Sequence, residues 1–273
     1  MFIEYLKFFG IGLLTSSIVT LLGIGGGLII LPILIYFTDI GLKAATAISA
    51  VQVFFASSFG TFFNRLQKTI NYRYAIIFGI SSGTTYFLGS YFTGLIPENT
   101  IKMIYLCSVI LALILFFMKR NNNNENDLEL AAQRIPGKAD YFKIIPISLI
   151  SGFFFGVLGV GGGFLYVPLL ILLFKLPLKV AIGTSLMIVL FNAIPGIVGK
   201  LLSIRFDIFL GLAVAVGAII GSRIGTYLNK KISEKIIKII FTLLLVLIIA
   251  RVAWDLYASF NGGGPLPFNS AYF

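Results

Sequence analysis

Long uninterrupted apolar runs constrain this chain more than any other feature. The runs at 104–118, 208–220 and 236–250 approach the roughly 20 apolar residues that a tilted transmembrane helix needs. Only 11% of the residues are charged, against about a quarter in an ordinary soluble chain. Backbone amides in hydrocarbon must be satisfied internally, so helices or a closed barrel are required, and runs without polar alternation favour helices. We predict an all-α, polytopic, multi-pass integral protein of the cell (inner) membrane.

The net charge of +11 would suggest nucleic acid as a partner if the chain were soluble. Here the basic residues stand at the ends of apolar segments, where the positive-inside rule explains them as cytoplasmic anchors. We therefore expect the lipid bilayer and a small anionic solute as partners, and no nucleic acid. The sequence leaves a homo-oligomer open.

An internal repeat is the most specific signal in the chain. The run Leu22-Gly-Ile-Gly-Gly-Gly-Leu-Ile-Ile-Leu-Pro32 is echoed by Leu158-Gly-Val-Gly-Gly-Gly-Phe-Leu-Tyr-Val-Pro168, 136 residues later, and the same shift without gaps pairs Ser49 with Ser185. Self-similarity at a fixed shift indicates a tandem duplication. We predict four regions: a first transmembrane repeat (1–118), a polar cytoplasmic linker (119–141), a second transmembrane repeat (142–258) and a C-terminal tail (259–273).

Each repeat begins with a glycine-broken segment, at 6–37 and 143–174. Three transmembrane helices follow it, at 45–63, 74–96 and 101–118 in the first repeat and at 181–199, 208–228 and 236–254 in the second. If the broken segment crosses the membrane, each repeat has four spans and the repeats are parallel (4 + 4). The loop lysines and arginines, among which we count Lys200, then divide almost evenly. If the segment is a re-entrant hairpin, the repeats are inverted and these residues concentrate on one face with the linker. This asymmetry favours inverted repeats.

Two clusters of four glycines interrupt the first segment of each repeat. They are Gly23, Gly25, Gly26 and Gly27, and Gly159, Gly161, Gly162 and Gly163. Each glycine costs a helix interior about 1 kcal/mol relative to alanine. The freed amides of a broken membrane helix and the positive end of its second half suit an anion. Close helix packing is the structural alternative, and the residues after the glycines do not match a nucleotide-binding P-loop.

Polar side chains follow each break at positions that could complete an anion site. They are the hydroxyls of Thr46, Ser49, Thr184 and Ser185 and the amides of Gln52 and Asn192. Helix capping and interhelical hydrogen bonding are the alternative roles. Lys43 and Lys179 would attract anions at the two mouths of a pathway, or snorkel to the interface.

The residue types that catalysis needs are scarce. The chain has no histidine and one cysteine, and no carboxylate lies in the middle of a predicted span. We therefore predict no catalytic residues, no metal site and no cofactor. The chain is not expected to be an enzyme. Asp255 follows Arg251 by four residues and is expected to pair with it along a helix.

The duplicated Leu-Gly-x-Gly-Gly-Gly-x-x-x-x-Pro element, with Gly183-Thr184-Ser185 after its second copy, resembles the sulfite exporter TauE/SafE family of membrane permeases. The likeness extends from residue 8 to 254. It implies transport of sulfite, sulfonates, thiosulfate or similar organic anions without ATP. It places the family's glycine motifs on 23–27 and 159–163 and its Thr-Ser element on Thr184 and Ser185. The first copy departs from this pattern with Ala47-Ile48-Ser49.

Together these features predict a secondary transporter or facilitator for a small sulfur-containing oxyanion. Backbone amides and hydroxyls at the two breaks would bind the anion near the middle of the bilayer. A channel-like anion pore and a non-transporting membrane assembly protein are the alternatives.

Overall fold

The computed structural model describes residues 2–38, 40–118 and 128–260, and within these ranges every regular element is a helix. This confirms the all-α prediction. The helices are α1 (Phe2–Leu22), α2 (Gly27–Phe37), α3 (Leu42–Leu66), α4 (Tyr72–Phe92), the 3₁₀ helix η1 (Thr93–Leu95), α5 (Glu98–Phe117), α6 (Leu128–Gln133), α7 (Lys138–Leu158), α8 (Gly163–Phe174), α9 (Leu178–Ser203), α10 (Ile208–Lys231) and α11 (Glu234–Phe260).

Seven of the described helices are long and apolar enough to cross a membrane: α1, α3, α5, α7, α9, α10 and α11. A multi-pass membrane protein is therefore confirmed by length and composition. The helix at the span predicted for 74–96 is α4, which is not among the seven. It carries a central Ser-Ser-Gly-Thr-Thr run, which lowers its hydropathy, although it has the same length as α1.

The helix boundaries repeat along the chain. α7, α8, α9, α10 and α11 begin 136 residues after α1, α2, α3, α4 and α5, respectively. The N-terminal capping is repeated too. The side chain of Asn71, which precedes α4, accepts a hydrogen bond from the Tyr74 amide. The side chain of Asp207, which precedes α10, accepts one from the Phe209 amide. α6 and the first turn of α7 lie within the range that the sequence assigned to the linker.

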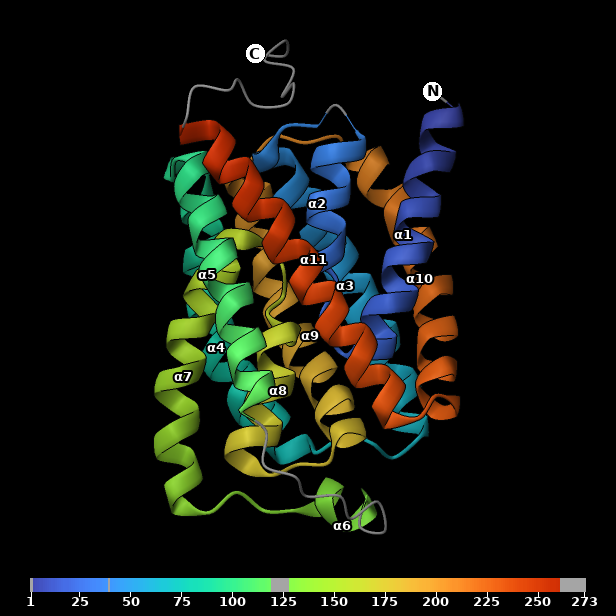
Figure 1. Ribbon diagram of the computed structural model, residues 1–273, viewed down its shortest axis with the longest axis vertical. Helices are drawn as coiled ribbons and strands as arrows, with labels where there is room; N and C mark the ends of the chain where they lie inside the picture. Colours follow the sequence, from blue (N-terminus) through green and yellow to red (C-terminus); the bar gives the residue numbers. More distant parts are fainter. Residues whose placement is uncertain (1, 39, 119–127, 261–273) are drawn as a thin grey trace.

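The direction of the helices differs between the two halves (Figure 1). α1 begins at the end of the bundle where α11 finishes, runs to about the middle, and α2 turns back toward the same end. α7 begins at the opposite end, beside α6, and α8 returns there. Both breaks therefore lie in the interior.

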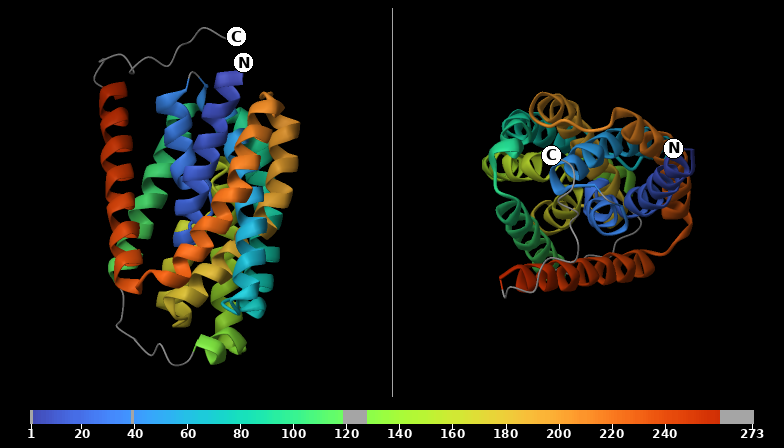
Figure 2. Two further views of the ribbon diagram at one scale, coloured as in Figure 1. Left: turned by 90° about the vertical axis from the view of Figure 1, so that its right-hand side faces the viewer. Right: turned by 90° about the horizontal axis from the view of Figure 1, so that it is seen from above.

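The two halves are interleaved. α1 packs along α10 and α7 along α4, as both views show (Figures 1 and 2). Glycines allow this close approach, because a Cβ at Gly225 of α10 would overlap the carbonyl of Ser17 in α1, and a Cβ at Gly89 of α4 would overlap that of Phe153 in α7. Small residues at helix contacts are the usual solution in membranes.

The centre of the bundle is formed by α3 and α9. Their most apolar stretches are 61% and 67% buried, against 22% for α5 and α11, which lie at the periphery (Figure 2). α3 and α9 also carry the hydroxyl, amide and lysine side chains that reach the glycine breaks, so the most buried helices hold the candidate site.

Candidate functional site

The glycine clusters break both helices, as the sequence predicts. α1 ends at Leu22 and α2 begins at Gly27, and α7 ends at Leu158 and α8 begins at Gly163. Backbone φ angles between 66° and 79° occur at Gly23, Gly25, Gly26, Gly159, Gly161 and Gly162. Residues with a Cβ rarely adopt these angles. The glycines therefore permit a conformation that other residues would strain.

The two breaks lie directly against each other. The Phe164 amide donates a 3.1 Å hydrogen bond to the Ile24 carbonyl. A Cβ at Gly163 would lie 2.6 Å from the Gly23 oxygen, and a Cβ at Gly161 would lie 2.7 Å from that of Gly25. Backbone meets backbone here, so an anion can enter between the breaks only if they separate.

Two buried serines join each break to the opposite half of the chain. Ser185 Oγ donates to the Gly23 carbonyl at 2.7 Å, and Ser49 Oγ donates to the Gly159 carbonyl at 3.0 Å. The four residues are related by the repeat shift of 136. The structure thus places both predicted serines at the breaks, where their hydroxyls hold carbonyl oxygens.

The two predicted threonines have different surroundings. The carbonyl oxygen of Thr46 is 2.5 Å from a Cβ built on Gly159, so this residue lies beside the second break. Thr184 instead accepts a 2.9 Å hydrogen bond from the Asn71 amide, at the turn between α3 and α4. The structure brings Thr46 to the breaks and directs Thr184 toward that turn.

Gln52 and Asn192 are fully buried amides. Gln52 Nε2 donates to Thr15 and Ser16 at 3.0 and 2.7 Å. Its Oε1 is buried without a hydrogen-bond partner among the described residues and lies 2.9 Å from a Cβ built on Gly26. This unpartnered acceptor faces the first break.

Asn192 belongs to a hydrogen-bond cluster beside the second break. Ser82 Oγ donates to its Oδ1 at 2.5 Å, and its Nδ2 donates to the Tyr166 hydroxyl at 3.0 Å. The neighbouring Tyr86 hydroxyl accepts a hydrogen bond from the Gly161 amide at 3.1 Å. Sequence reasoning missed both tyrosines. Tyr166 stands in an apolar run, and Tyr86 follows the polar run of α4 but was not singled out among its hydroxyl residues.

Lys200 is a further residue of this region that sequence reasoning did not assign to the site. We counted it with the loop lysines, but it lies inside α9 and is 1% exposed. Its Nζ donates to Thr46 Oγ1 at 3.2 Å, Thr93 Oγ1 at 2.6 Å and the Val157 carbonyl at 2.9 Å. The repeat shift aligns Lys200 with Asn64, but the spans predicted at 45–63 and 181–199 end just before these two residues, whereas the structure places both inside helices.

The predicted mouth lysines lie near the starts of α3 and α9, at opposite ends of the bundle (Figure 1). Lys43 Nζ donates to the Gly94 carbonyl at 2.9 Å, and Lys179 is half-buried. Within the part of the chain that the structure describes, the side chain of neither lysine forms a hydrogen bond to a glycine break.

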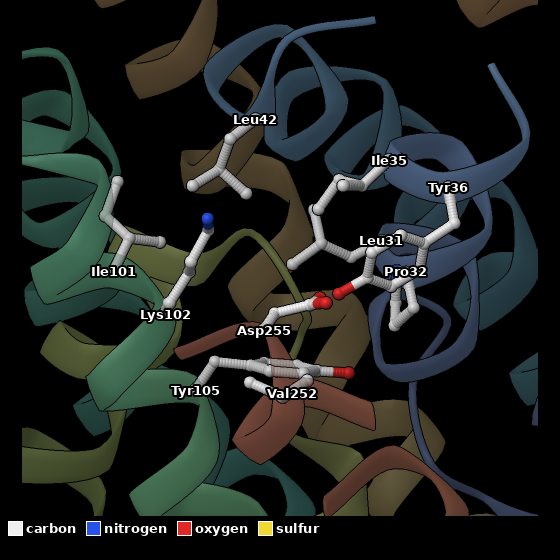
Figure 3. A pocket seen from close by; sticks show the side chains of 10 residues that line it. All are labelled: Leu31, Pro32, Ile35, Tyr36, Leu42, Ile101, Lys102, Tyr105, Val252 and Asp255. Atoms are coloured by element: carbon white, nitrogen blue, oxygen red, sulfur yellow. The ribbon is translucent and has the colours of Figure 1, made fainter. Parts of the chain in front are cut away.

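A cavity away from the breaks lies between α2, α5 and α11 (Figure 3). The Asp255 carboxylate and the Lys102 amine extend into it from α11 and α5. Arg251 pairs with Asp255 at 3.8 Å, as predicted from their spacing, and its guanidinium lies 4.1 Å from the centroid of the Tyr36 ring. Within the described residues, no group of His, Cys, Asp and Glu side chains could hold a metal ion.

A polar centre enclosed by apolar helices, with two broken helices meeting inside it, defines a multi-pass membrane protein of the transporter class. The sulfite exporter TauE/SafE model matches residues 8–252. The chain belongs to this family, as its glycine motifs predicted.

Curated relatives agree with this class. The chain is 29% identical over 224 residues to the probable membrane transporter protein YunE of Bacillus subtilis, covering 76% of this chain and 82% of the relative. It is 28% identical over 201 residues to a probable membrane transporter protein of Methanocaldococcus jannaschii, covering 70% of each chain. Both relatives are named as probable membrane transporters, not as enzymes. No solved structure matches the chain.

Proposed function

We propose that this protein is a secondary transporter or facilitator that carries a small sulfur-containing oxyanion across the membrane. Its family and its relatives support transport. The observation that supports an anion as the solute is the contact between the two glycine breaks inside the bundle. This contact brings the N-termini of α2 and α8 to the centre. Amides at such termini, with the positive end of the helix dipole, favour negative charge.

The repeats are inverted in this proposal. Support comes from the 136-residue spacing of the helix starts, together with the opposite directions of α1 and α7 (Figure 1). Each repeat then supplies a re-entrant hairpin, and the distribution of the basic residues supports a cytoplasmic linker. Inverted repeats allow the central site to open alternately to the two sides.

The anion would be bound by backbone amides of both breaks, with hydroxyls and amides of α3 and α9 nearby. Ser49, Ser185 and Thr46 would contribute hydroxyls, and Gln52 and Asn192 would line the pathway. The breaks are in contact here, so the proposed cycle passes through this closed arrangement. Opening would separate the contact between Phe164 and Ile24 on one side of the centre.

The experiment is a flux assay with the purified protein in liposomes. Uptake of sulfite, thiosulfate, methanesulfonate and a neutral solute is compared with that of empty liposomes and of liposomes with the Gly26→Val variant. We expect saturable uptake of at least one sulfur oxyanion. Linear, non-saturating uptake would indicate a pore, while uptake of a cation without any anion would refute the proposal.

A further inference from the structure

Lys200 is a buried amine whose hydrogen-bonding groups match an ammonium. Its three partners, Thr46 Oγ1, Thr93 Oγ1 and the Val157 carbonyl, all act as acceptors. The threonine hydroxyls themselves donate to backbone carbonyls, that of Thr46 to Lys43 at 2.6 Å and that of Thr93 to Val157 at 3.1 Å. An ammonium has three donors and no acceptor. The arrangement therefore suits the protonated form.

This charge has no acidic partner in the described part of the chain. The ion pairs recorded there join other basic residues to acids, Lys238 to Glu234 and Arg251 to Asp255. Among the residues that bind Lys200, Thr46 has a charged residue close to it in sequence, Lys43. That residue is also basic, and its ammonium binds the Gly94 carbonyl. A buried charge without an opposite charge is strongly unfavourable. Neutral oxygens and the C-terminal end of α7 offset only part of this cost.

The lysine lies beside the second glycine break. A Cβ on Gly159 would be 3.4 Å from Lys200 Cε, and Val157 and Gly159 flank the last residue of α7. Ser49 binds the Gly159 carbonyl from the neighbouring helix. An anion between the breaks would therefore be within reach of the lysine.

The fold does not require a cation at this position. The repeat shift places Asn64 at the equivalent position of α3, where its Nδ2 donates to the Gly60 carbonyl at 2.8 Å. The same shift relates Asn229 of α10 to Thr93 and Leu21 to Val157. The Asn229 side chain donates to the Leu21 carbonyl at 2.6 Å. Neutral amides are thus sufficient beside the first break. The positive charge is specific to the second.

We propose that Lys200 is the counter-charge for the carried anion and that it selects monoanions over dianions. This inference rests on the proposed transport function. The N-termini of α2 and α8 contribute partial positive charges at this centre but no formal charge. Lys200 adds a formal positive charge beside the second break. It would neutralise a sulfonate, whereas the second charge of thiosulfate would stay buried and uncompensated.

The first test uses the unaltered protein. Uptake of methanesulfonate in liposomes is measured in competition with ethanesulfonate, a monoanion, and with thiosulfate, a dianion. We expect ethanesulfonate to compete about tenfold more strongly, because one uncompensated charge is costly in a buried site. Equal or stronger competition by thiosulfate would overturn the selection of monoanions.

The second test uses Lys200→Asn, which places the side chain of the equivalent Asn64 position at residue 200. Lys238→Gln on α11 is the matched control, since it also removes one lysine. We expect methanesulfonate uptake to fall about tenfold or more in Lys200→Asn and to be retained in Lys238→Gln. Methanesulfonate should also raise the melting temperature of the unaltered protein but not of Lys200→Asn.

The outcomes separate the two proposals. If the unaltered protein carries no sulfur oxyanion, the proposed function fails. If it carries them and folded Lys200→Asn carries them equally well, only the counter-charge role fails. Should Lys200→Asn not fold, the competition measurement on the unaltered protein still decides the charge selection.

Discussion

Ser185 in α9 donates a hydrogen bond of 2.7 Å to the carbonyl of Gly23, the first residue after α1. The bond crosses 162 residues of sequence and joins the central helix of one half to the break of the other. Ser49 makes the matching bond to Gly159. The two breaks are therefore positioned by side chains that the opposite half supplies.

Removing these serine hydroxyls should destabilise the protein. Each of Ser49→Ala and Ser185→Ala leaves a buried carbonyl without that donor, and we expect a loss of about 1–3 kcal/mol in stability. Ser108→Ala is the control, because Ser108 Oγ binds the Ile104 carbonyl of its own helix and no other described residue. Thermal unfolding in detergent measures the effect. Melting temperatures equal to that of the control would contradict it.

Valine in place of Gly26 or Gly162 should abolish anion transport. Both positions have positive φ angles, 78° and 79°, and a Cβ at Gly26 would lie 2.8 Å from Val53 Cγ2 while one at Gly162 would overlap the Phe155 ring. Gly10→Val is the matched control, since a Cβ there meets nothing within 4 Å. Liposome flux is the measurement. Retained flux in both variants, with correct insertion, would exclude the breaks as the binding site.

The Asn192→Ala variant should be less stable. It places at residue 192 the side chain of the equivalent residue in the first half, Ala56, but removes the partner of the Ser82 and Tyr166 hydroxyls. Buried hydroxyls without a partner cost about 1–3 kcal/mol. Asn192→Asp keeps the acceptor for the Ser82 hydroxyl but removes the Nδ2 donor to the Tyr166 hydroxyl, and it serves as the comparison. If Asn192→Ala melts at the temperature of the unaltered protein, the cluster is not structural.

A large side chain at Gly225 should disrupt the packing of α1 on α10. A Cβ there already overlaps the Ser17 carbonyl, so leucine must force the helices apart. Overpacking of this kind costs about 1–3 kcal/mol or more. Gel filtration after purification should show less folded protein for Gly225→Leu than for Gly10→Leu, whose site is open. Equal yields and melting temperatures would indicate that the helices adapt.

The features that the sequence predicts best are those set by backbone chemistry. Four glycines within five residues cost a helix about 1 kcal/mol each relative to alanine, so the breaks at 23–27 and 159–163 could be predicted from the glycine clusters. The repeat shift then indicates where serines 49 and 185 lie relative to them. The repeat did not predict that each serine binds the break of the opposite half, because that pairing depends on how the two halves pack.

Side-chain direction could not be predicted in the same way. Thr184 stands beside Ser185 in sequence, yet it faces Asn71 because adjacent residues on a helix point about 100° apart. Lys200 lies near the end of α9, where most membrane lysines snorkel to the interface. Only the packing of α7, α3 and η1 around it closes that route.

The interleaving of α1 with α10 and of α7 with α4 bears on biogenesis. A ribosome that has completed only the first half has made a helix whose partner surface, with Gly217, Gly221 and Gly225, does not yet exist. α1 therefore lacks its packing partner until α10 is inserted, and the native bundle can form only near the end of synthesis. Halves produced as separate polypeptides would have to find each other before either could mature.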